Sequence, residues 1–179
     1  MKNIFLLVSV AFNISAFAQI PTDGLVGYYP FTGNANDNSG NSNNGTVNGA
    51  TLTTDRFGNP DNAYYFNGSN ANIQVANTAG LNVANGDSLS ISCWIKHDLS
   101  STNIDKYFIS KYDGVSSTSS AYALGTGQQG NGYTWHQIAA GSSNGVGIRS
   151  QKTINDGSWH HFLSVLEMGG STKLYIDGV

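Results

Sequence analysis

The residues with the clearest chemical potential lie in one loop. Side-chain oxygen atoms are concentrated there on Asp37, Asn38, Ser39, Asn41, Asn43 and Asn44. Calcium is a hard cation that takes several oxygen ligands from carboxylates, amides and backbone carbonyls. We therefore identify Asp37, Asn41 and Asn43 as candidate metal ligands.

The same residue types also form turns without a metal ion, because Asn, Asp and Ser side chains bond to nearby backbone groups. The loop is not an EF-hand: its sixth position would be Ser42 rather than glycine, and its twelfth would be Asn48 rather than glutamate. At the level of sequence, a calcium site and metal-free turn chemistry are both open interpretations.

Glycosidase chemistry has little support. Hydrolysis of a glycosidic bond needs two carboxyl groups that face each other across a sugar ring. The single glutamate, Glu167, ends a predicted strand before a Gly-Gly turn, and no two aspartates lie two positions apart on a predicted strand. We therefore predict no catalytic residues and no enzymatic activity.

The histidines form no catalytic or metal-binding motif. His160 and His161 are neighbours on a predicted strand, so their side chains point to opposite faces and cannot chelate one ion together. The face of His161 also carries Trp159, Leu163 and Val165. This apolar face predicts that His161 is a hydrogen-bonded histidine of the interior.

A group of aromatic residues in the middle of the chain could bind sugars, whose apolar C–H faces stack on aromatic rings. Tyr133 and Trp135 lie two positions apart and so on one side of a predicted strand. We identify them as candidate ligand-binding residues. Packing in the core is the alternative, because aromatic residues dominate β cores.

Short strands must position all of these residues. Apolar and polar residues alternate with period two, and Gly, Asn, Asp and Ser separate the runs. The predicted strands are Leu25–Phe31, Ala63–Phe66, Asn72–Val75, Ser88–Lys96, Tyr107–Lys111, Ala121–Gly125, Tyr133–Ala139, Val146–Arg149, Trp159–Glu167 and Thr172–Ile176. The pattern predicts an all-β fold, an antiparallel two-sheet β-sandwich or jelly roll.

Strand Ser88–Lys96 has the clearest alternation. Trp94 lies on its otherwise polar face, which indicates that this face is covered too. Cys93 lies on the apolar face and is the only cysteine, so an internal disulfide is excluded. We expect a buried free thiol, with pairing to a cysteine outside this sequence as the alternative.

Residues 1–18 have the features of an export signal. Lys2 precedes the apolar run Ile4–Ile14, and Ala16-Phe17-Ala18 is a small-residue cleavage site. The run is too short for a membrane span, so the predicted mature domain is 19–179, located outside the cell or on its surface. Loss of Lys2 changes the formal net charge from −3 to −4, which argues against nucleic-acid binding.

Four segments occur in an order typical of a known family. They are Gly24–Phe31, Gly33–Asn41, Ala63–Gly68 with Ile73–Val75, and Ser90–Lys96 with the closing Leu174–Gly178. In this order they resemble the laminin G-like, concanavalin A-like jelly-roll superfamily, in particular its exported bacterial modules. The resemblance implies an opening strand at Gly24–Phe31 and a hairpin from Ala63 to Val75.

The resemblance has further implications. Related modules often hold a structural calcium ion near the loop after the first strand, and Asp37 matches their acid. Glucanases of the superfamily carry a Glu-x-Asp-x-x-Glu pattern, which this chain lacks. In the family, further strands follow the Asp-Gly turn at Asp177-Gly178, so we expect a fragment that lacks its C-terminal strands.

Two functions fit these expectations. The first is a non-catalytic exported module for binding and adhesion that recognises glycans or cell-surface proteins, with a structural calcium ion. The second is a structural spacer or accessory module within a larger surface protein or glycoside hydrolase.

Overall fold

A computed structural model of the protein describes residues 20–83, 87–97, 106–111, 121–126, 133–139, 146–167 and 172–179. The regular elements in these ranges are strands, apart from one short 3-10 helix, η1, at Ala79–Leu81. Every strand pair is antiparallel. The predicted all-β, antiparallel class is therefore confirmed.

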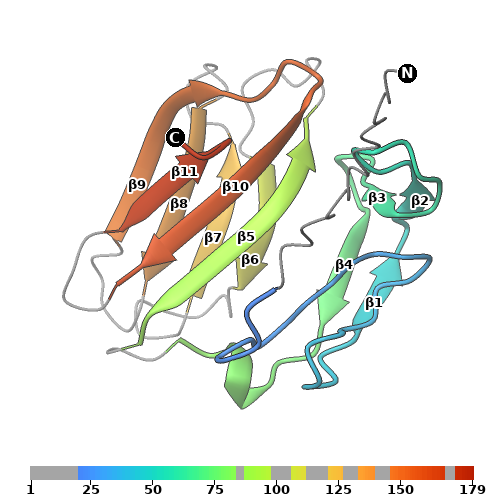
Figure 1. Ribbon diagram of the computed structural model, residues 1–179, viewed down its shortest axis with the longest axis horizontal. Coiled ribbons are helices and arrows are strands. Elements are labelled where there is room, and N and C mark those ends of the chain that lie inside the picture. The colour runs from blue at the N-terminus through green and yellow to red at the C-terminus, as the bar shows by residue number, and fades with distance from the viewer. Residues whose placement is uncertain are drawn as a thin grey trace, which may run out of the picture.

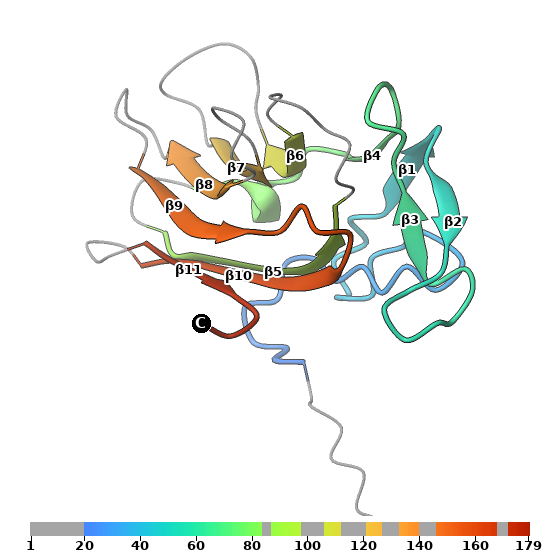
Figure 2. The same cartoon turned by 90° about the horizontal axis from the view of Figure 1, so that it is seen from above.

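Two sheets form the two layers of a sandwich (Figures 1 and 2). One has the order β11-β10-β5, with bounds β5 Leu89–Lys96, β10 Trp159–Leu166 and β11 Lys173–Ile176. The other has the order β6-β7-β8-β9, with bounds β6 Lys106–Lys111, β7 Ala121–Thr126, β8 Tyr133–Ala139 and β9 Val146–Thr153. The β-sandwich prediction is confirmed.

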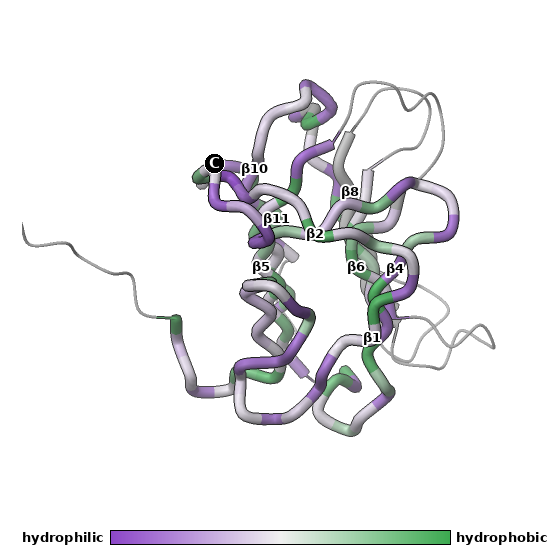
Figure 3. The backbone as a smooth tube through the Cα atoms, turned by 90° about the vertical axis from the view of Figure 1, so that its right-hand side faces the viewer, coloured by the Kyte–Doolittle hydropathy of each residue, from purple (hydrophilic) through white to green (hydrophobic). Residues whose placement is uncertain are grey.

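Two small sheets lie beside the sandwich, next to β5 (Figure 1). They are β1-β4 and β2-β3, with bounds β1 Gly45–Asn48, β2 Thr51–Thr53, β3 Ala63–Tyr65 and β4 Asn72–Val75. Figure 3, viewed from this side, shows that β5 and β6 lie in different layers, with hydrophobic stretches on both.

The core fills the space between the two layers. Its fully buried members are Leu124, Ile154, Phe162 and Ile176. Phe108 of β6 meets Phe162 of β10 edge-to-face with ring centroids 5.8 Å apart, so this aromatic pair joins the layers. Cys93 packs half-buried against the same core, and burial raises its pKa to about 12.

The segment Leu25–Phe31 is not a strand, and this prediction was wrong. Its backbone groups bond to the following loop rather than to a neighbouring strand. The Leu25 and Val26 carbonyls accept from Asn side chains, and the Tyr28 N–H donates to Asp37. The Asn and Asp side chains of the loop therefore compete successfully with a neighbouring strand for these backbone groups.

The predicted hairpin from Ala63 to Val75 was also wrong. The two strands exist at nearly the predicted positions, but β3 pairs with β2 and β4 pairs with β1. Sequence reasoning missed β1 and β2, which are short and largely exposed and so have little hydrophobic alternation. Strand β9 continues to Thr153, beyond its predicted end at Arg149.

The Asp-Gly turn signal is confirmed. Asp177 and Gly178 have φ values of 55° and 84°, and Ile176 and Val179 exchange backbone hydrogen bonds across them. Two consecutive positive φ values are typical of a two-residue turn of type I′, which Asp-Gly favours.

We predict that Phe162→Ala lowers the free energy of unfolding by about 3 to 5 kcal/mol, because it empties space that the two sheets cannot close. Urea denaturation measures this loss. The matched truncation Phe57→Ala, at a side chain that is largely exposed, should cost about 1 kcal/mol or less. Equal costs at the two positions would contradict the assigned core.

Candidate functional site

The outer face of the sheet β11-β10-β5 carries an accessible group of aromatic and cationic side chains. The outward row of β5 consists of Ser90, Ser92, Trp94 and Lys96. The four are exposed, while the alternate residues face the core. This row therefore offers two hydroxyls, an indole and an ammonium group to solvent.

Arg56 stacks on this row from the loop between β2 and β3. Its guanidinium carbon lies 4.4 Å from the ring centroid of Trp94 and 4.0 Å from that of Phe57. Trp94 remains 45% exposed and Phe57 71% exposed. We call these three residues the Arg56 stack. The prediction that Trp94 is covered is correct only in part, since Arg56 covers one portion of it.

His161 lies next to the stack. Its ring centroid is 5.1 Å from that of Trp94, its cross-strand neighbour, and its Nε2 lies 2.8 Å from the Ser92 hydroxyl. The prediction of an interior His161 was wrong, because its face of β10 is the half-buried outer one. The buried histidine is instead His160, and the two side chains do point to opposite faces as predicted.

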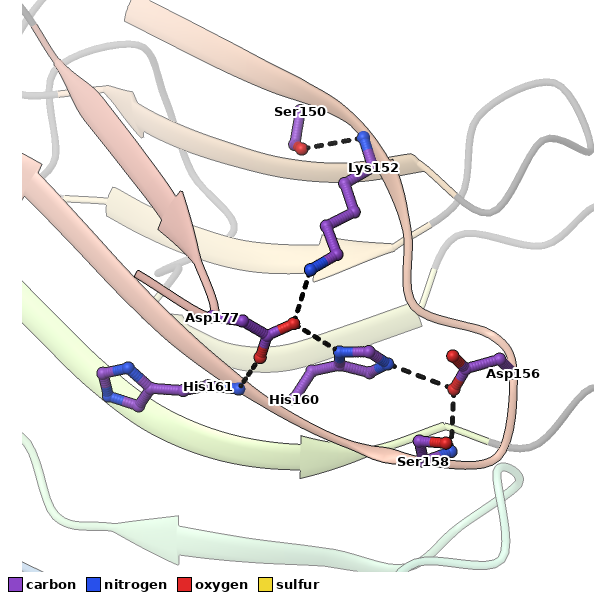
Figure 4. Close-up of polar contacts among 7 residues, drawn as sticks. All are labelled: Ser150, Lys152, Asp156, Ser158, His160, His161 and Asp177. Atoms are coloured by element: carbon purple, nitrogen blue, oxygen red, sulfur yellow. Dashed lines mark hydrogen bonds and ion pairs between the residues drawn. The ribbon is translucent and has the colours of Figure 1, made fainter. Parts of the chain in front are cut away.

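His160 occupies the centre of a charged cluster on the inner side of β10 (Figure 4). Its Nδ1 lies 2.8 Å from Asp177 Oδ2, and its Nε2 lies 3.1 Å from Asp156 Oδ1. Lys152 of β9 donates to the same Asp177 oxygen at 2.6 Å. The other Asp177 oxygen accepts from the backbone N–H of His161 at 2.9 Å.

The cluster favours a protonated imidazole, since both ring nitrogens face carboxylate oxygens and only the imidazolium can donate from both. Burial opposes protonation, but the bonds to Asp177 and Asp156 raise the pKa of His160. Burial likewise opposes ionisation of Asp177, but Lys152 and His160 lower its pKa. The Ser158 backbone N–H and His160 lower the pKa of Asp156.

The candidate metal ligands form a hydrogen-bonded knot. Asp37 Oδ1 accepts from the Tyr28 and Ser39 N–H groups, and Oδ2 accepts from the Ser39 hydroxyl and the Asn43 N–H, at 2.8 to 3.0 Å. The amides of Asn41 and Asn43 donate to Leu25 and Val26. Partial burial raises the pKa of Asp37, but the hydrogen bonds that its carboxylate accepts outweigh this effect and lower the pKa to about 2.

Each oxygen of Asp37 thus accepts two hydrogen bonds, which is the full capacity of a carboxylate. A calcium ion at this carboxylate would have to displace these donors. Within the described ranges, no three His, Cys, Asp or Glu side chains are grouped so that they could hold a metal ion. The calcium site at Asp37, Asn41 and Asn43 stays a prediction, and turn chemistry accounts for the observed contacts.

Three other predictions fall wholly or partly outside the described residues. The backbone of Tyr133 and Trp135 lies in β8, paired with β7 and β9, but their side chains lie outside the described part of the structure. The expected export signal, residues 1–18, and the Gly-Gly turn before β11 also lie outside it. All three stay predictions.

Sequence reasoning missed the Arg56 stack and the link between His160 and Asp177. The placement of Trp94 on a polar strand face was a signal for the first, but nothing in the sequence pointed to Arg56 as its partner. Both contacts join residues far apart in the chain, which periodicity within one element cannot reveal.

The fold and its outer face can now be compared with known proteins. The sequence profile of the concanavalin A-like lectin/glucanases superfamily matches residues 67–179, which is more than half of the chain. The chain therefore belongs to this superfamily. A comparison with curated proteins found no match.

A solved structure has a similar fold: the crystal structure of the binding domain of Paraclostridial Mosquitocidal Protein 1. The TM-score is 0.55 with 17% sequence identity, and the match covers 79% of this chain but 35% of that chain. At this identity the likeness concerns the fold alone. Among the described residues, no helix is long and apolar enough to cross a membrane.

We predict that His160→Gln removes a pH dependence of stability. Because the folded pKa is raised above 6.5, the contribution is complete below pH 6.5 and is lost as pH rises through the folded pKa. The variant should lose about 1 to 2 kcal/mol at pH 6 and have a flatter slope up to pH 9, measured by urea denaturation. His161→Gln, on the opposite face, should keep the wild-type slope.

We predict that Asp37→Asn lowers the free energy of unfolding by about 2 to 3 kcal/mol in buffer with a chelator, because an amide cannot accept all four hydrogen bonds. Thermal unfolding with added calcium tests the ion separately. A rise in the melting temperature of the wild type that the variant lacks would support the calcium site. A variant as stable as the wild type would contradict the knot.

Proposed function

We propose that the chain is a non-catalytic, exported binding module that recognises glycans or cell-surface proteins through the outer face of β11-β10-β5. The observation that carries the proposal is the Arg56 stack, whose aromatic rings are partly open to solvent on a sheet face lined with hydroxyl groups. Stacked rings beside hydrogen-bonding groups are typical of recognition surfaces. The similar solved structure, itself a binding domain, agrees with it.

The chemistry of the carboxylates supports a non-catalytic role. A glycosidase keeps one carboxyl group protonated as the general acid, through a raised pKa. Asp156 and Asp177, whose carboxylates share His160, both have lowered pKa values. They are therefore ionised together and act as an ion-pair network rather than as an acid–base pair.

The calcium ion remains part of this proposal as a structural cofactor near Asp37, Asn41 and Asn43. Its function would be to stabilise the loop rather than to contact a ligand, because this loop is already bonded to the segment before it. The Asp37→Asn measurement above decides between the ion and the hydrogen bonds alone.

The second candidate is a structural spacer or accessory module of a larger surface protein or glycoside hydrolase. One observation favours this candidate: the match to the similar binding domain covers 35% of that chain. In that protein, this sandwich is thus one portion of a longer chain.

Screening the purified chain against arrays of glycans and of extracellular proteins tests the binding function. We expect at least one ligand whose binding is reduced about tenfold or more by Trp94→Ala, with an unchanged circular dichroism spectrum. The matched control is Tyr65→Ala, another exposed aromatic position, in β3. Failure to bind any ligand would overturn the binding function and favour the spacer.

A further inference from the structure

The guanidinium group of Arg56 makes no hydrogen bond or ion pair with any described residue, although both of its ring contacts are formed. The neighbouring Asp55 carboxylate does not occupy it. That carboxylate accepts hydrogen bonds from the Phe57 and Asn59 N–H groups and from the Asn59 amide. The N–H donors on the guanidinium edge are therefore available to a ligand.

The stacking arrangement determines which part of the guanidinium can bind. The rings of Phe57 and Trp94 lie 4.0 and 4.4 Å from the guanidinium carbon and restrict the side chain, while the N–H groups along the planar guanidinium edge make no hydrogen bond to any described residue. Such an edge presents parallel N–H groups that match the two oxygens of a carboxylate or of a sulfate group. A preorganised side chain also loses less entropy on binding than a free one.

A second cation lies in the same row. Lys96 follows Trp94 by two positions on the outward face of β5, roughly 7 Å along the strand, and has no described ion partner. Other lysines of the described residues are engaged: Lys152 with Asp177, Lys173 with Glu167, and Lys111 with Asn77.

Arg56, whose charge is felt by the neighbouring Asp55 but which forms no ion pair with a described residue, and Lys96 stand out because the chain as a whole is acidic. It contains 8 Lys and Arg against 11 Asp and Glu residues, with a formal net charge of −3. An anionic ligand would be repelled by the molecule in general and attracted at this face in particular. Charge complementarity therefore restricts the class of ligand.

The remaining groups of the row favour a sugar over an acidic peptide. The exposed rings of Trp94 and Phe57 suit the C–H face of a sugar ring, and the exposed residue Ser90 offers a hydroxyl for its hydroxyl groups, while the Ser92 hydroxyl is paired with His161. A sugar acid has both an apolar ring face and an anionic group on one small rigid unit. An acidic amino acid has its carboxylate on a flexible stem without a ring.

We propose that Arg56, with the outward row of β5, binds an acidic polysaccharide by pairing the guanidinium edge with a carboxylate or sulfate group of one sugar unit. This inference rests on the proposed binding function and names its ligand class. Trp94 and Phe57 contact the ring of that unit, and Lys96 contributes a second positive charge. The site differs from the Tyr133 and Trp135 prediction, which concerns the other sheet.

The test measures binding of the full chain to four polymers by isothermal titration calorimetry at low and at moderate salt. Polygalacturonate carries carboxylates on sugars, dextran sulfate carries sulfates on sugars, dextran is neutral, and polyglutamate carries carboxylates without sugars. We expect binding to polygalacturonate, to dextran sulfate or to both, which identifies the anionic group, and weaker binding at higher salt. Dextran and polyglutamate should bind at least about tenfold more weakly.

Three variants relate the binding to the site. Arg56→Gln should weaken binding of the acidic polysaccharide about tenfold or more, and Arg56→Lys should recover only part of the loss because the bidentate edge is missing. Lys173→Gln removes the same charge at a lysine paired with Glu167, and should change binding less than about twofold. Circular dichroism and thermal unfolding establish that each variant is folded.

Equal losses in Arg56→Gln and Lys173→Gln would overturn the inference, because the binding would then follow net charge alone. Binding of polyglutamate as tight as that of the polysaccharides would overturn the sugar assignment. Tight binding of a neutral glycan or a protein that Arg56→Gln leaves intact would overturn the inference while the proposed function stands. If neither these polymers nor the arrays provide a ligand, both fail.

Discussion

The arrangement of β9, β10 and β11 depends on the contacts that the carboxylate of Asp177 makes. It bonds to Lys152 of β9, to the imidazole of His160, and to the backbone N–H of His161 in β10. These bonds fasten the turn after β11 to a strand of each layer (Figure 4). Because His160 is held inward, the alternation of β10 directs His161 outward, beside Trp94.

The few charged residues have two different kinds of environment. The Asp37 knot and the His160 cluster satisfy their charges internally, so these groups stabilise the loop and the meeting point of the sheets. Arg56 is stabilised instead by aromatic rings, and its donors are left for a partner. At sheet β11-β10-β5, the His160 cluster lies on the inner side and Trp94, which contacts Arg56, lies on the outer side.

The sequence predicted the strands of the sandwich well, most clearly β5 and β10, whose burial alternates with period two. It failed at Leu25–Phe31, where the alternation is real but loop side chains bond to the backbone. It failed again at the histidines. Trp159, Leu163 and Val165 are apolar, yet they belong to the outer face, so apolar neighbours misassigned His161 to the interior.

The sequence by itself determined the all-β class, the strand positions in the sandwich and the Asp-Gly turn, since each depends on neighbours close in the chain. Only the tertiary structure decided that His160 pairs with Asp156 and Asp177, and that Arg56 stacks on Trp94. The physical reason is that such contacts depend on how sheets and loops meet in space. The periodicity of a strand shows which of its residues share a face, but not which residues pack against that face.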